Sequence, residues 1–487
     1  MHQNFPRLVL GMKVKQLRLK LQLSLRELSD MTELSISYLN EIEKGKKYPK
    51  PEKLVVLAES LGVAYDDLVS THLDDELNPL SEVLDSALIQ KFPLDLFGIT
   101  PNDVLQLLSQ APREAGALAR TVVDITRNYD MGIENFFHAA LRSFQELHAN
   151  HFPEIELEAA SFRKRTGELH TWHACSTALT ELTGAEVTWL PEETSFQKLR
   201  SIWVPGSKPC LFLNRMLLDN QKAFVIAREI GYRVLGLDQR ALTSPPIEVQ
   251  TFDQVLNDFK ASYFAGALLI DRLKLSKAMR EFFSHDHWDA AMFSHLMHQF
   301  HATPEMFFYR LSQVLPEENG LERIHFLRFT SKDQSYYLTK ELNMSDVGIP
   351  SGISLNEHFC RRWLSLQVID LHRGGQTAPD IQISRFLDKP TQFLCISVAR
   401  ALVLQPDTWS SVTLGFQLDG ATRRRIAFHN DKNIQQRVLG QTCERCPLSE
   451  EECTQRVAPP TKLNHRNRLI AQRRAVQEFL EKNRRPN

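Results

Sequence analysis

The first seventy residues restrict the fold of this chain most tightly, because helix start and stop signals there alternate with apolar residues at helical spacing. Four apolar residues would share one face of a first helix: Leu10, Val14, Leu17 and Leu21. Ser24, with Glu27 three residues later, forms the capping-box pattern that begins a second helix. Ser35 is placed to cap a third helix and Gly45 to end it. The pattern predicts about five short helices before residue 72.

Two of these helices, separated by a turn of three or four residues, make a helix-turn-helix. In that motif the second helix, here residues 35–44, lies in the major groove of DNA. Its outward polar residues would meet bases or phosphates, and the lysines that follow suit the phosphate backbone. The predicted DNA-contacting residues are Ser35, Ser37, Tyr38, Asn40, Glu41, Lys44, Lys46 and Lys47.

The sequence LSLRELSDMTELSISYLNEIEKGKKYPKPEKLVVLAESLGV, residues 23–63, resembles the XRE (phage-repressor type) helix-turn-helix family. The resemblance implies sequence-specific binding to double-stranded DNA, usually by dimers on inverted half-sites. Family members usually have glutamine after the first serine of the second helix, whereas this chain has Leu25.

Bulk composition limits where DNA contact can arise. The chain has 487 residues, enough for three or four domains, with a formal net charge of −1 and a pI near 7.0. Contact with nucleic acid therefore needs a local basic patch. Because no apolar run reaches about 18 residues and the amino terminus lacks a signal-peptide core, we expect a cytoplasmic protein without membrane spans. Its thiols would stay reduced, which argues against structural disulfides.

The middle of the chain contains an altered zinc-peptidase motif. Residues 224–237, FVIAREIGYRVLGL, are spaced as an amphipathic helix. Zinc peptidases carry H-E-x-x-H there: two histidines one turn apart bind zinc, and the glutamate activates water. This chain keeps Glu229 but has Arg228 and Tyr232 at the ligand positions. Arginine cannot lose its proton to bind zinc.

These residues, with NDFKASYFAGALLID at residues 257–271, resemble the peptidase-like domain of the ImmA/IrrE family. Asp258 falls about where the third zinc ligand of that family would sit. Residues 301–316, with a helix start at Thr303, resemble the closing helix of the same domain. The resemblance implies an α+β, zincin-like fold in a degenerate form, without enzymatic activity.

The C-terminal third combines strand-like segments with a cysteine cluster. Residues 392–404, 411–419 and 424–430 are predicted to be strands of a mixed α/β sensor domain. Three cysteines follow close together: Cys443, Cys446 and Cys453. A tetrahedral metal site needs a fourth ligand, either Cys360 or a nearby histidine. Zinc and a [4Fe–4S] cluster both accept such a set, and the spacing alone does not separate them.

The order HFCRRW (residues 358–363) and then TCERCPLSEEECTQRVAPP (residues 442–460) resembles the C-terminal motif of the short-chain fatty acyl-CoA regulator family. That motif reads C-P-R-W, later C-x-x-C and then D-C-x-Q-R-A-x-P-P. Here Arg361 replaces the proline and Glu452 the aspartate, and every thiolate is kept. The resemblance implies a [4Fe–4S] cluster, with zinc as the alternative, and a short-chain acyl-CoA effector. The implied ligands are Cys360, Cys443, Cys446 and Cys453.

These expectations describe a multidomain, non-enzymatic transcription regulator of short-chain fatty acid and acyl-CoA metabolism genes. The predicted domains are a helix-turn-helix (1–72), a helical connector that forms homodimers or higher homo-oligomers (80–152), a degenerate peptidase-like domain (153–320), a sensor domain (321–460) and a basic helical tail (461–487). The acidic residues 71–80 would be a linker. The alternatives are a DNA-binding metalloprotease of the ImmA/IrrE type and an antitoxin-like regulator. The tail could touch DNA or an acidic CoA, although a solvated helix is its ordinary explanation.

Overall fold

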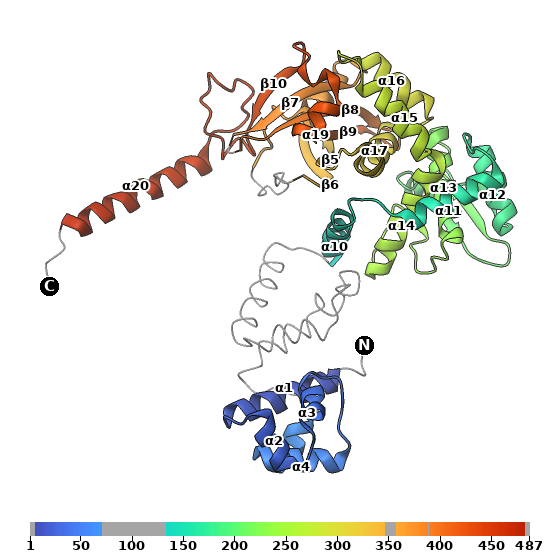
Figure 1. Cartoon of the computed structure of the whole chain (residues 1–487). Coiled ribbons are helices and arrows are strands. Elements are labelled where there is room, and N and C mark those ends of the chain that lie inside the picture. Colours follow the sequence, from blue (N-terminus) through green and yellow to red (C-terminus); the bar gives the residue numbers. More distant parts are fainter. Residues whose placement is uncertain (1–4, 71–132, 346–356, 388, 483–487) are drawn as a thin grey trace. The chain divides into compact units, whose positions relative to one another are not determined.

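A computed structural model describes residues 5–70, 133–345, 357–387 and 389–482 (Figure 1). The chain divides into two compact units. Unit 1 holds the residues up to Phe144 together with Gln250–Phe252, and unit 2 holds Gln145–Val249 and the residues from Asp253 onward. The linker expected at 71–80 and most of the connector expected at 80–152 lie outside the described residues.

Five helices begin unit 1, as the sequence predicts (Figure 1). They are α1 (Phe5–Lys20), α2 (Leu25–Thr32), α3 (Ile36–Glu43), α4 (Pro51–Leu61) and α5 (Tyr65–Val69). Ser24 and Glu27 form the capping box of α2, and the hydroxyl of Ser35 caps α3. Gly45 follows α3 with a φ of 66°, the left-handed conformation of a helix-ending glycine.

Helix α1 is held closely against the other helices of this bundle. Leu10 and Val14 lie in the core, whereas Leu21, expected on the same face, is 49% exposed because α1 ends before it. Arg18 forms a double ion pair with Glu43, at 2.6 and 3.0 Å, which joins α1 to the end of α3. A Cβ at Gly11 would lie 2.3 Å from a carbonyl oxygen of α3, so glycine is what allows the two helices to approach.

Unit 2 begins with an α+β region. Its small sheet has the order β1-β3-β2-β4, in which β1 is parallel to β3 and the other pairs are antiparallel. The strands are β1 (Glu186–Trp189), β2 (Ser201–Val204), β3 (Cys210–Leu213) and β4 (Thr243–Ser244). Helix α10 (Ile133–Leu147) lies mostly in unit 1 and ends in unit 2. The helices that follow are α11 (Pro153–Thr166), α12 (Trp172–Thr183), α13 (Asp219–Val234), α14 (Phe252–Leu269), α15 (Arg272–Phe283), α16 (Ala290–Gln299) and α17 (Pro304–Asn319). A single 3-10 turn, η2 (Thr194–Phe196), precedes β2.

A six-stranded sheet follows, with the order β10-β7-β8-β9-β5-β6. Only the β10–β7 pair is parallel. The strands are β5 (Ile324–Lys332), β6 (Ser335–Asn343), β7 (Asp380–Phe386), β8 (Gln392–Leu402), β9 (Gln405–Gln417) and β10 (Gln435–Leu439). The helices of this part are α18 (Leu364–Arg373), α19 (Gly420–Arg425) and α20 (Thr461–Lys482).

Helices cover both faces of the large sheet. On β8, Leu394 and Ile396 alternate with Phe393 and Cys395: the first pair joins a core with α15, α16 and α17, the second a core beneath α18. A strand covered on both faces needs apolar residues on both, which is why this stretch has an almost continuous apolar sequence. The peptidase-like helices and the sheet therefore share one core.

One predicted strand is wrong. Residues 424–430 form the end of α19 and a 3-10 turn, η3 (Ala427–Asn430). The side chain of Asp419 accepts a hydrogen bond of 2.8 Å from the Thr422 amide, which starts a helix where strand composition alone predicted β-structure. In the described part of the chain, no helix has both the length and the apolar character needed to span a bilayer.

Candidate functional sites

The predicted DNA-contacting residues lie on α3 and the loop after it. Five are exposed: Ser35, Ser37, Lys44, Lys46 and Lys47. Three are half-buried: Tyr38, Asn40 and Glu41. The ammonium group of Lys53 lies 4.4 Å from the centre of the Tyr38 ring, and Glu41 forms an ion pair with Lys47 at 2.9 Å. These two half-buried side chains thus hold Lys53 and Lys47 at the surface of the helix-turn-helix.

One exposed residue of α3 was not predicted as a contact. Ile36 is 46% exposed in the first turn of the helix, where recognition helices carry base-contacting residues. An apolar side chain there can contact a thymine methyl group in the major groove. An isoleucine in an amphipathic pattern is normally assigned to the core, so the sequence pattern predicts that Ile36 is buried.

The three positions that would bind zinc in a peptidase lie together in the structure, but here they form an ion pair and a hydrogen bond. Arg228 lies 3.2 Å from Asp258, and the Tyr232 hydroxyl donates to the same carboxylate oxygen at 3.1 Å. Burial lowers the pKa of Arg228, but the charges of Asp258 and Glu229 outweigh it and the pKa ends raised. A permanent guanidinium cation therefore faces Asp258 where the peptidases hold zinc. Glu229 accepts two hydrogen bonds from Arg240, at 2.5 and 2.8 Å, so its carboxylate is already engaged.

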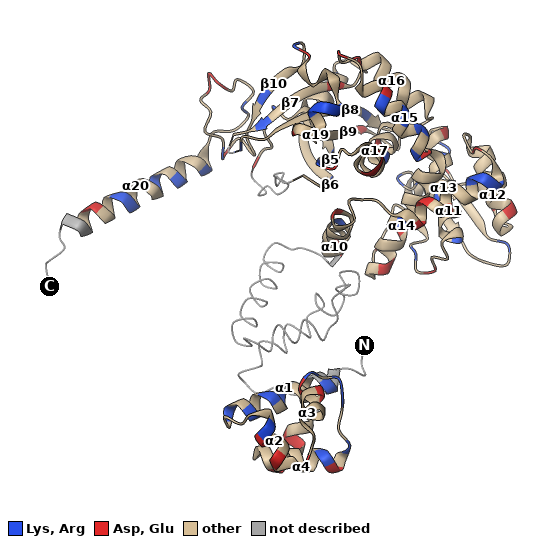
Figure 2. Cartoon of the chain, in the orientation of Figure 1, with Lys and Arg blue, Asp and Glu red and all other residues tan. Residues whose placement is uncertain are grey.

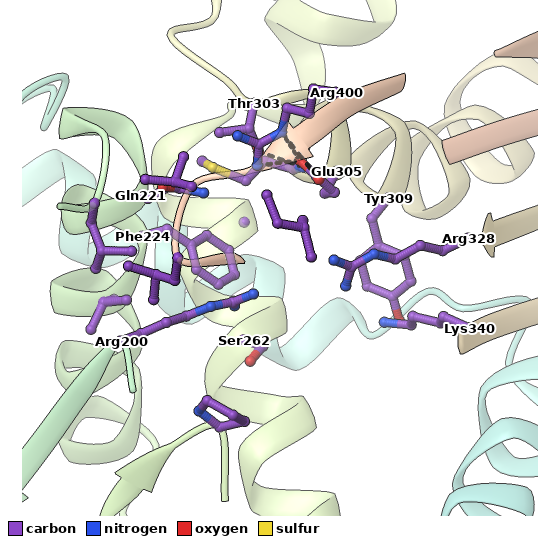
Figure 3. Close-up of a pocket in the computed structure, with 18 of the residues that line it drawn as sticks. Arg200, Gln221, Phe224, Ser262, Thr303, Glu305, Tyr309, Arg328, Lys340 and Arg400 are labelled. Atoms are coloured by element: carbon purple, nitrogen blue, oxygen red, sulfur yellow. Dashed lines mark hydrogen bonds and ion pairs between the residues drawn. The ribbon is translucent and has the colours of Figure 1, made fainter. Parts of the chain in front are cut away.

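A pocket of about 300 Å³ opens beside this altered motif (Figure 3). It is lined by helices α13, α14 and α17, by strands β5, β6 and β8, and by the segment before β2. Gln221 and Val225 of α13 line it, and Arg228 and Tyr232 continue the same helical face by one and two turns. The pocket and the former zinc positions thus follow one side of α13. We call it the basic pocket.

Six cationic side chains line the basic pocket: Lys198, Arg200, Arg310, Arg328, Lys340 and Arg400. Glu305 is the one acid among the described lining residues, and it pairs with Arg400 at 2.7 Å. Figure 3 shows the guanidinium groups of Arg200 and Arg328 directed into the same space. Apolar side chains supply much of the remaining wall, among them Leu217, Phe224, Phe326 and Leu402. Positive charge exceeds negative charge here, beside apolar surface.

The charges in the basic pocket influence one another. Arg200 keeps access to solvent but has protein on most sides, so burial, followed by repulsion from Arg328 and Arg228, lowers its pKa to about 10. Burial raises the pKa of Glu305, but Arg400 and Arg328 outweigh burial and the pKa ends lowered. Glu305 is therefore ionised at neutral pH. The arrangement suits an anionic ligand that has an apolar part.

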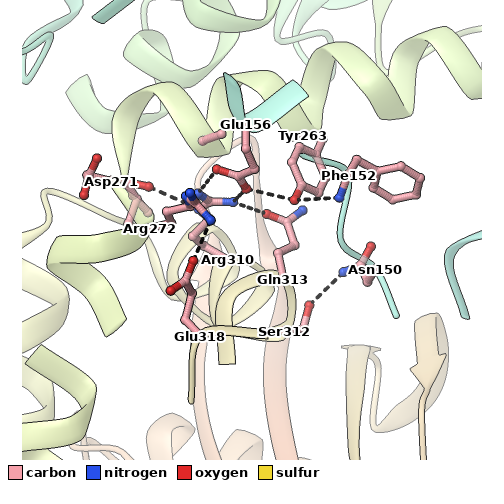
Figure 4. Close-up of polar contacts among 12 residues, drawn as sticks. Asn150, Phe152, Glu156, Tyr263, Asp271, Arg272, Arg310, Ser312, Gln313 and Glu318 are labelled. Atoms are coloured by element: carbon pink, nitrogen blue, oxygen red, sulfur yellow. Dashed lines mark hydrogen bonds and ion pairs between the residues drawn. The ribbon is translucent and has the colours of Figure 1, made fainter. Parts of the chain in front are cut away.

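A buried ion pair, shown in Figure 4, includes one of the residues that line the basic pocket. Arg310, 1% exposed, donates to both oxygens of Glu156 at 2.6 and 2.9 Å, and the Tyr263 hydroxyl donates to the same carboxylate at 2.8 Å. Arg310 also donates to Gln313 at 3.1 Å, and both line the pocket. Burial raises the pKa of Glu156, but hydrogen bonding to Arg310 and its charge outweigh burial and lower it. The Arg310–Glu156 pair is neutral overall, so the excess positive charge of the pocket comes from its other lining cations.

The sequence-predicted cysteines gather in one part of unit 2. All four are free thiols and at most 8% exposed: Cys360, Cys443, Cys446 and Cys453. Burial raises the pKa of Cys360 to about 11, and the nearby charges of Cys453 and Cys446 add to this. No group of three or more His, Cys, Asp or Glu side chains in the described ranges is arranged to hold a metal ion as it stands. The donor chemistry fits zinc or an iron–sulfur cluster, and binding would need the thiols to turn toward a common centre.

The segment that carries three of these thiols, residues 440–456, is called the cysteine loop. A bridge between Phe359 and Thr442 and a hydrogen bond from Cys360 N to Gln441 O (3.2 Å) join it to the segment before α18. The indole of Trp363 donates to Gly440 O at 2.9 Å.

Charged residues complete this scaffold. Arg445 pairs with Glu357 at 2.6 and 2.7 Å, and His358 contacts Glu444 at 2.8 Å. Arg456 donates to the carbonyl oxygen of Cys443 at 3.0 Å, and also to Cys446 and Leu448. The loop is thus held by contacts outside the thiols themselves.

Comparison with known proteins matches the first two parts of this architecture. Residues 11–72 match the helix-turn-helix domain family, and residues 181–312 match the IrrE N-terminal-like domain family. The chain thus combines a helix-turn-helix domain, a DNA-binding fold, with an IrrE-like domain whose zinc positions are replaced. Among solved structures, a Mycobacterium tuberculosis transcriptional regulator is similar, with a TM-score of 0.48 and 18% identity, over 66% of this chain and 94% of that chain. No curated protein matches.

Proposed function

We propose that this chain is a one-component transcription regulator whose unit 2 receives an anionic, partly apolar metabolite of the short-chain acyl-CoA class. The helix-turn-helix match supports the DNA-binding half. The ligand half rests on one observation: six cationic side chains and one carboxylate line the basic pocket beside apolar wall, and of the six, Arg310 is neutralised by the buried Glu156. The acyl-CoA assignment and the regulated genes come from the resemblance of the cysteine motif and remain a prediction.

The chemistry of an acyl-CoA suits this pocket. Its phosphates need cations, which Arg200, Arg328 and Lys340 offer, and its acyl arm needs apolar surface such as Leu217 and Phe224. A volume of about 300 Å³ lies at the small end for ligand pockets, so we expect it to hold one end of the molecule. A ligand there would bridge helices α13 and α17 to strands β5 and β8.

Regulation requires that the ligand bind one arrangement of the protein better than another, because equal binding to both would shift nothing. We expect the bridged state to differ from the free state in its affinity for operator DNA. A homodimer or higher homo-oligomer would carry that difference to two half-sites.

Removing a lining cation that forms no ion pair with the described residues tests the ligand assignment. In Arg328→Ala the affinity for propionyl-CoA, measured by titration calorimetry, should fall about 10- to 100-fold, since a charge-assisted contact is worth roughly 1.5–3 kcal/mol. Arg385→Ala, which removes an exposed arginine of β7 outside the pocket, is the matched control. Equal affinity in both variants, or an operator affinity indifferent to acyl-CoA, would contradict the proposal.

We infer that the cysteine loop and Cys360 hold a [4Fe–4S] cluster, with zinc as the alternative. Four buried thiols and their charged scaffold support metal binding. A bound cluster would add redox sensitivity; the protein's own residues supply burial and position.

Metal analysis distinguishes a [4Fe–4S] cluster from zinc. Protein purified without oxygen should contain iron and sulfide and absorb near roughly 400 nm, as iron–sulfur clusters do. Cys446→Ser should lose the metal and unfold more readily, because metal binding and folding are coupled, whereas the half-exposed Cys210→Ser should keep it. A colourless zinc protein would overturn the cluster.

We infer further that the IrrE-like domain does not hydrolyse peptides. Its three ligand positions are taken by the contact of Arg228 and Tyr232 with Asp258, and Glu229 is held by Arg240. We expect no zinc-dependent cleavage of casein by the wild-type chain. Cleavage that stops with a zinc chelator and is absent from Glu229→Gln would favour the metalloprotease alternative instead.

A further inference from the structure

Helix α20 is a basic helix that the functions above leave unexplained. It runs for 22 residues, and every residue from Asn464 to Phe479 is exposed. Figure 2 shows basic residues spread along its length. The cations include Arg466, Arg468, Arg473 and Arg474, against the acids Glu478 and Glu481. None of these four arginines forms a hydrogen bond or ion pair with the described residues, whereas Arg310, Arg328 and Arg400 of the basic pocket each do.

We propose that α20 is a second DNA-binding element, which contacts the phosphate backbone without reading sequence. This rests on the DNA-binding half of the proposed function. Helix α20 carries six Lys and Arg residues against two Glu, whereas the whole chain has a net charge of −1, so positive charge is concentrated locally on this helix. Exposed, unpaired arginines gain most from a partner of dense negative charge, and duplex DNA presents about one phosphate per 1.7 Å of its axis.

Pairing with a second copy of α20 is the competing use. Leu469, Val476 and Phe479 are 42–66% exposed and share one side of the helix, as a helix–helix contact would need. Arg466 and Arg473 lie next to that side, however, and two copies would bring these like charges together. Charge complementarity therefore favours DNA as the occupant.

The direction of α20 is set by the cysteine loop. Leu463, in the first turn of α20, donates its amide to Glu444 O at 3.0 Å, and Arg456 holds the carbonyl of Cys443. Only residues 457–460, which end in two prolines, separate Arg456 from the helix. A change in the cysteine loop would therefore redirect the DNA-binding helix.

The test uses the full-length chain and duplex DNA, either operator or unrelated in sequence, titrated by fluorescence anisotropy between about 50 and 200 mM salt. The variant Arg466→Ala/Arg468→Ala/Arg473→Ala/Arg474→Ala should bind both duplexes about 10- to 100-fold more weakly at the lowest salt. Its log–log salt slope should fall by about two to four, since each phosphate contact contributes about 0.9. The ratio between operator and unrelated DNA should stay unchanged.

The matched control is Lys164→Ala/Lys277→Ala/Arg280→Ala/Lys332→Ala, which removes four exposed cations elsewhere in unit 2. Equal slopes for the two variants would overturn the proposal. Loss of self-association by the α20 variant in sedimentation, with an unchanged salt slope, would assign the helix to a second copy. A wild-type chain that binds neither duplex would instead refute the proposed function.

A separate variant tests whether the cysteine loop positions α20 for DNA binding. Arg456→Gln keeps all four cysteines but loses the contacts to the loop carbonyls, and it should lower the salt slope toward that of the α20 variant. Added to that variant, Arg456→Gln should then have little further effect. Additive losses would show that the loop does not position the helix.

Discussion

Arg310→Met is expected to lower the free energy of unfolding of this chain by about 3–5 kcal/mol, because it leaves Glu156 buried without its counter-charge. Arg310 is 1% exposed and Glu156 6%, so solvent cannot replace the lost partner. Urea unfolding followed by circular dichroism measures the change.

Two controls make this expectation specific. The double variant Glu156→Gln/Arg310→Met removes the stranded charge and should be less destabilised than Arg310→Met alone. Arg272→Met breaks the Arg272–Glu318 pair shown in Figure 4, in which the arginine is 38% exposed. That change should cost less than about 1 kcal/mol, as surface pairs usually do. A similar loss in Arg272→Met and Arg310→Met would contradict the role of burial.

The same pair predicts a pH dependence. The pKa of Glu156 is lowered in the folded protein, so its contribution to stability is present above the unfolded value of 4.5 and is lost as pH falls through the folded pKa. The wild-type chain should therefore lose stability more steeply than Glu156→Gln/Arg310→Met below about pH 4.5. Parallel profiles would show that the carboxylate does not titrate with folding.

Glu305→Gln is expected to strengthen binding of an anionic ligand about 10-fold or more while making the ligand-free protein less stable. Glu305 is the one acid among the described lining residues of the basic pocket, and its charge offsets those of Arg400 and Arg328. Its removal raises the positive potential that a phosphate would meet, and each tenfold in affinity needs only about 1.4 kcal/mol.

If the negative charge of Glu305 opposes the ligand, Glu305→Gln should raise ligand affinity and lower the stability of the ligand-free protein. Calorimetry with propionyl-CoA should show tighter binding, and thermal unfolding without ligand should show a lower midpoint, because Arg400 loses its partner. Glu318→Gln, which neutralises an acid outside the pocket, should leave affinity unchanged. Weaker binding in Glu305→Gln would mean that Glu305 holds Arg400 in place for the ligand.

Local sequence was sufficient to predict the helices of the helix-turn-helix, because the signals that begin and end a helix act over three to five residues. The capping box at Ser24 and Glu27, the cap at Ser35 and the glycine at 45 are confirmed at the predicted positions. The same local reasoning failed at residues 424–430, where the cap at Asp419 decided for a helix. It also gave no reason to expect Ile36 at the surface.

By itself the sequence determined the helix-turn-helix, the loss of the zinc ligands at Arg228 and Tyr232, and the set of four cysteines, because each depends on residue type at short spacing. Only the tertiary structure decided that Arg228 replaces the metal as the partner of Asp258, and that the basic pocket exists at all. Its cations come from segments as far apart as Lys198 and Arg400. Charges so distant in sequence act together only after the sheet and α17 bring them to one pocket, where the surrounding protein weakens the screening of their repulsion by water.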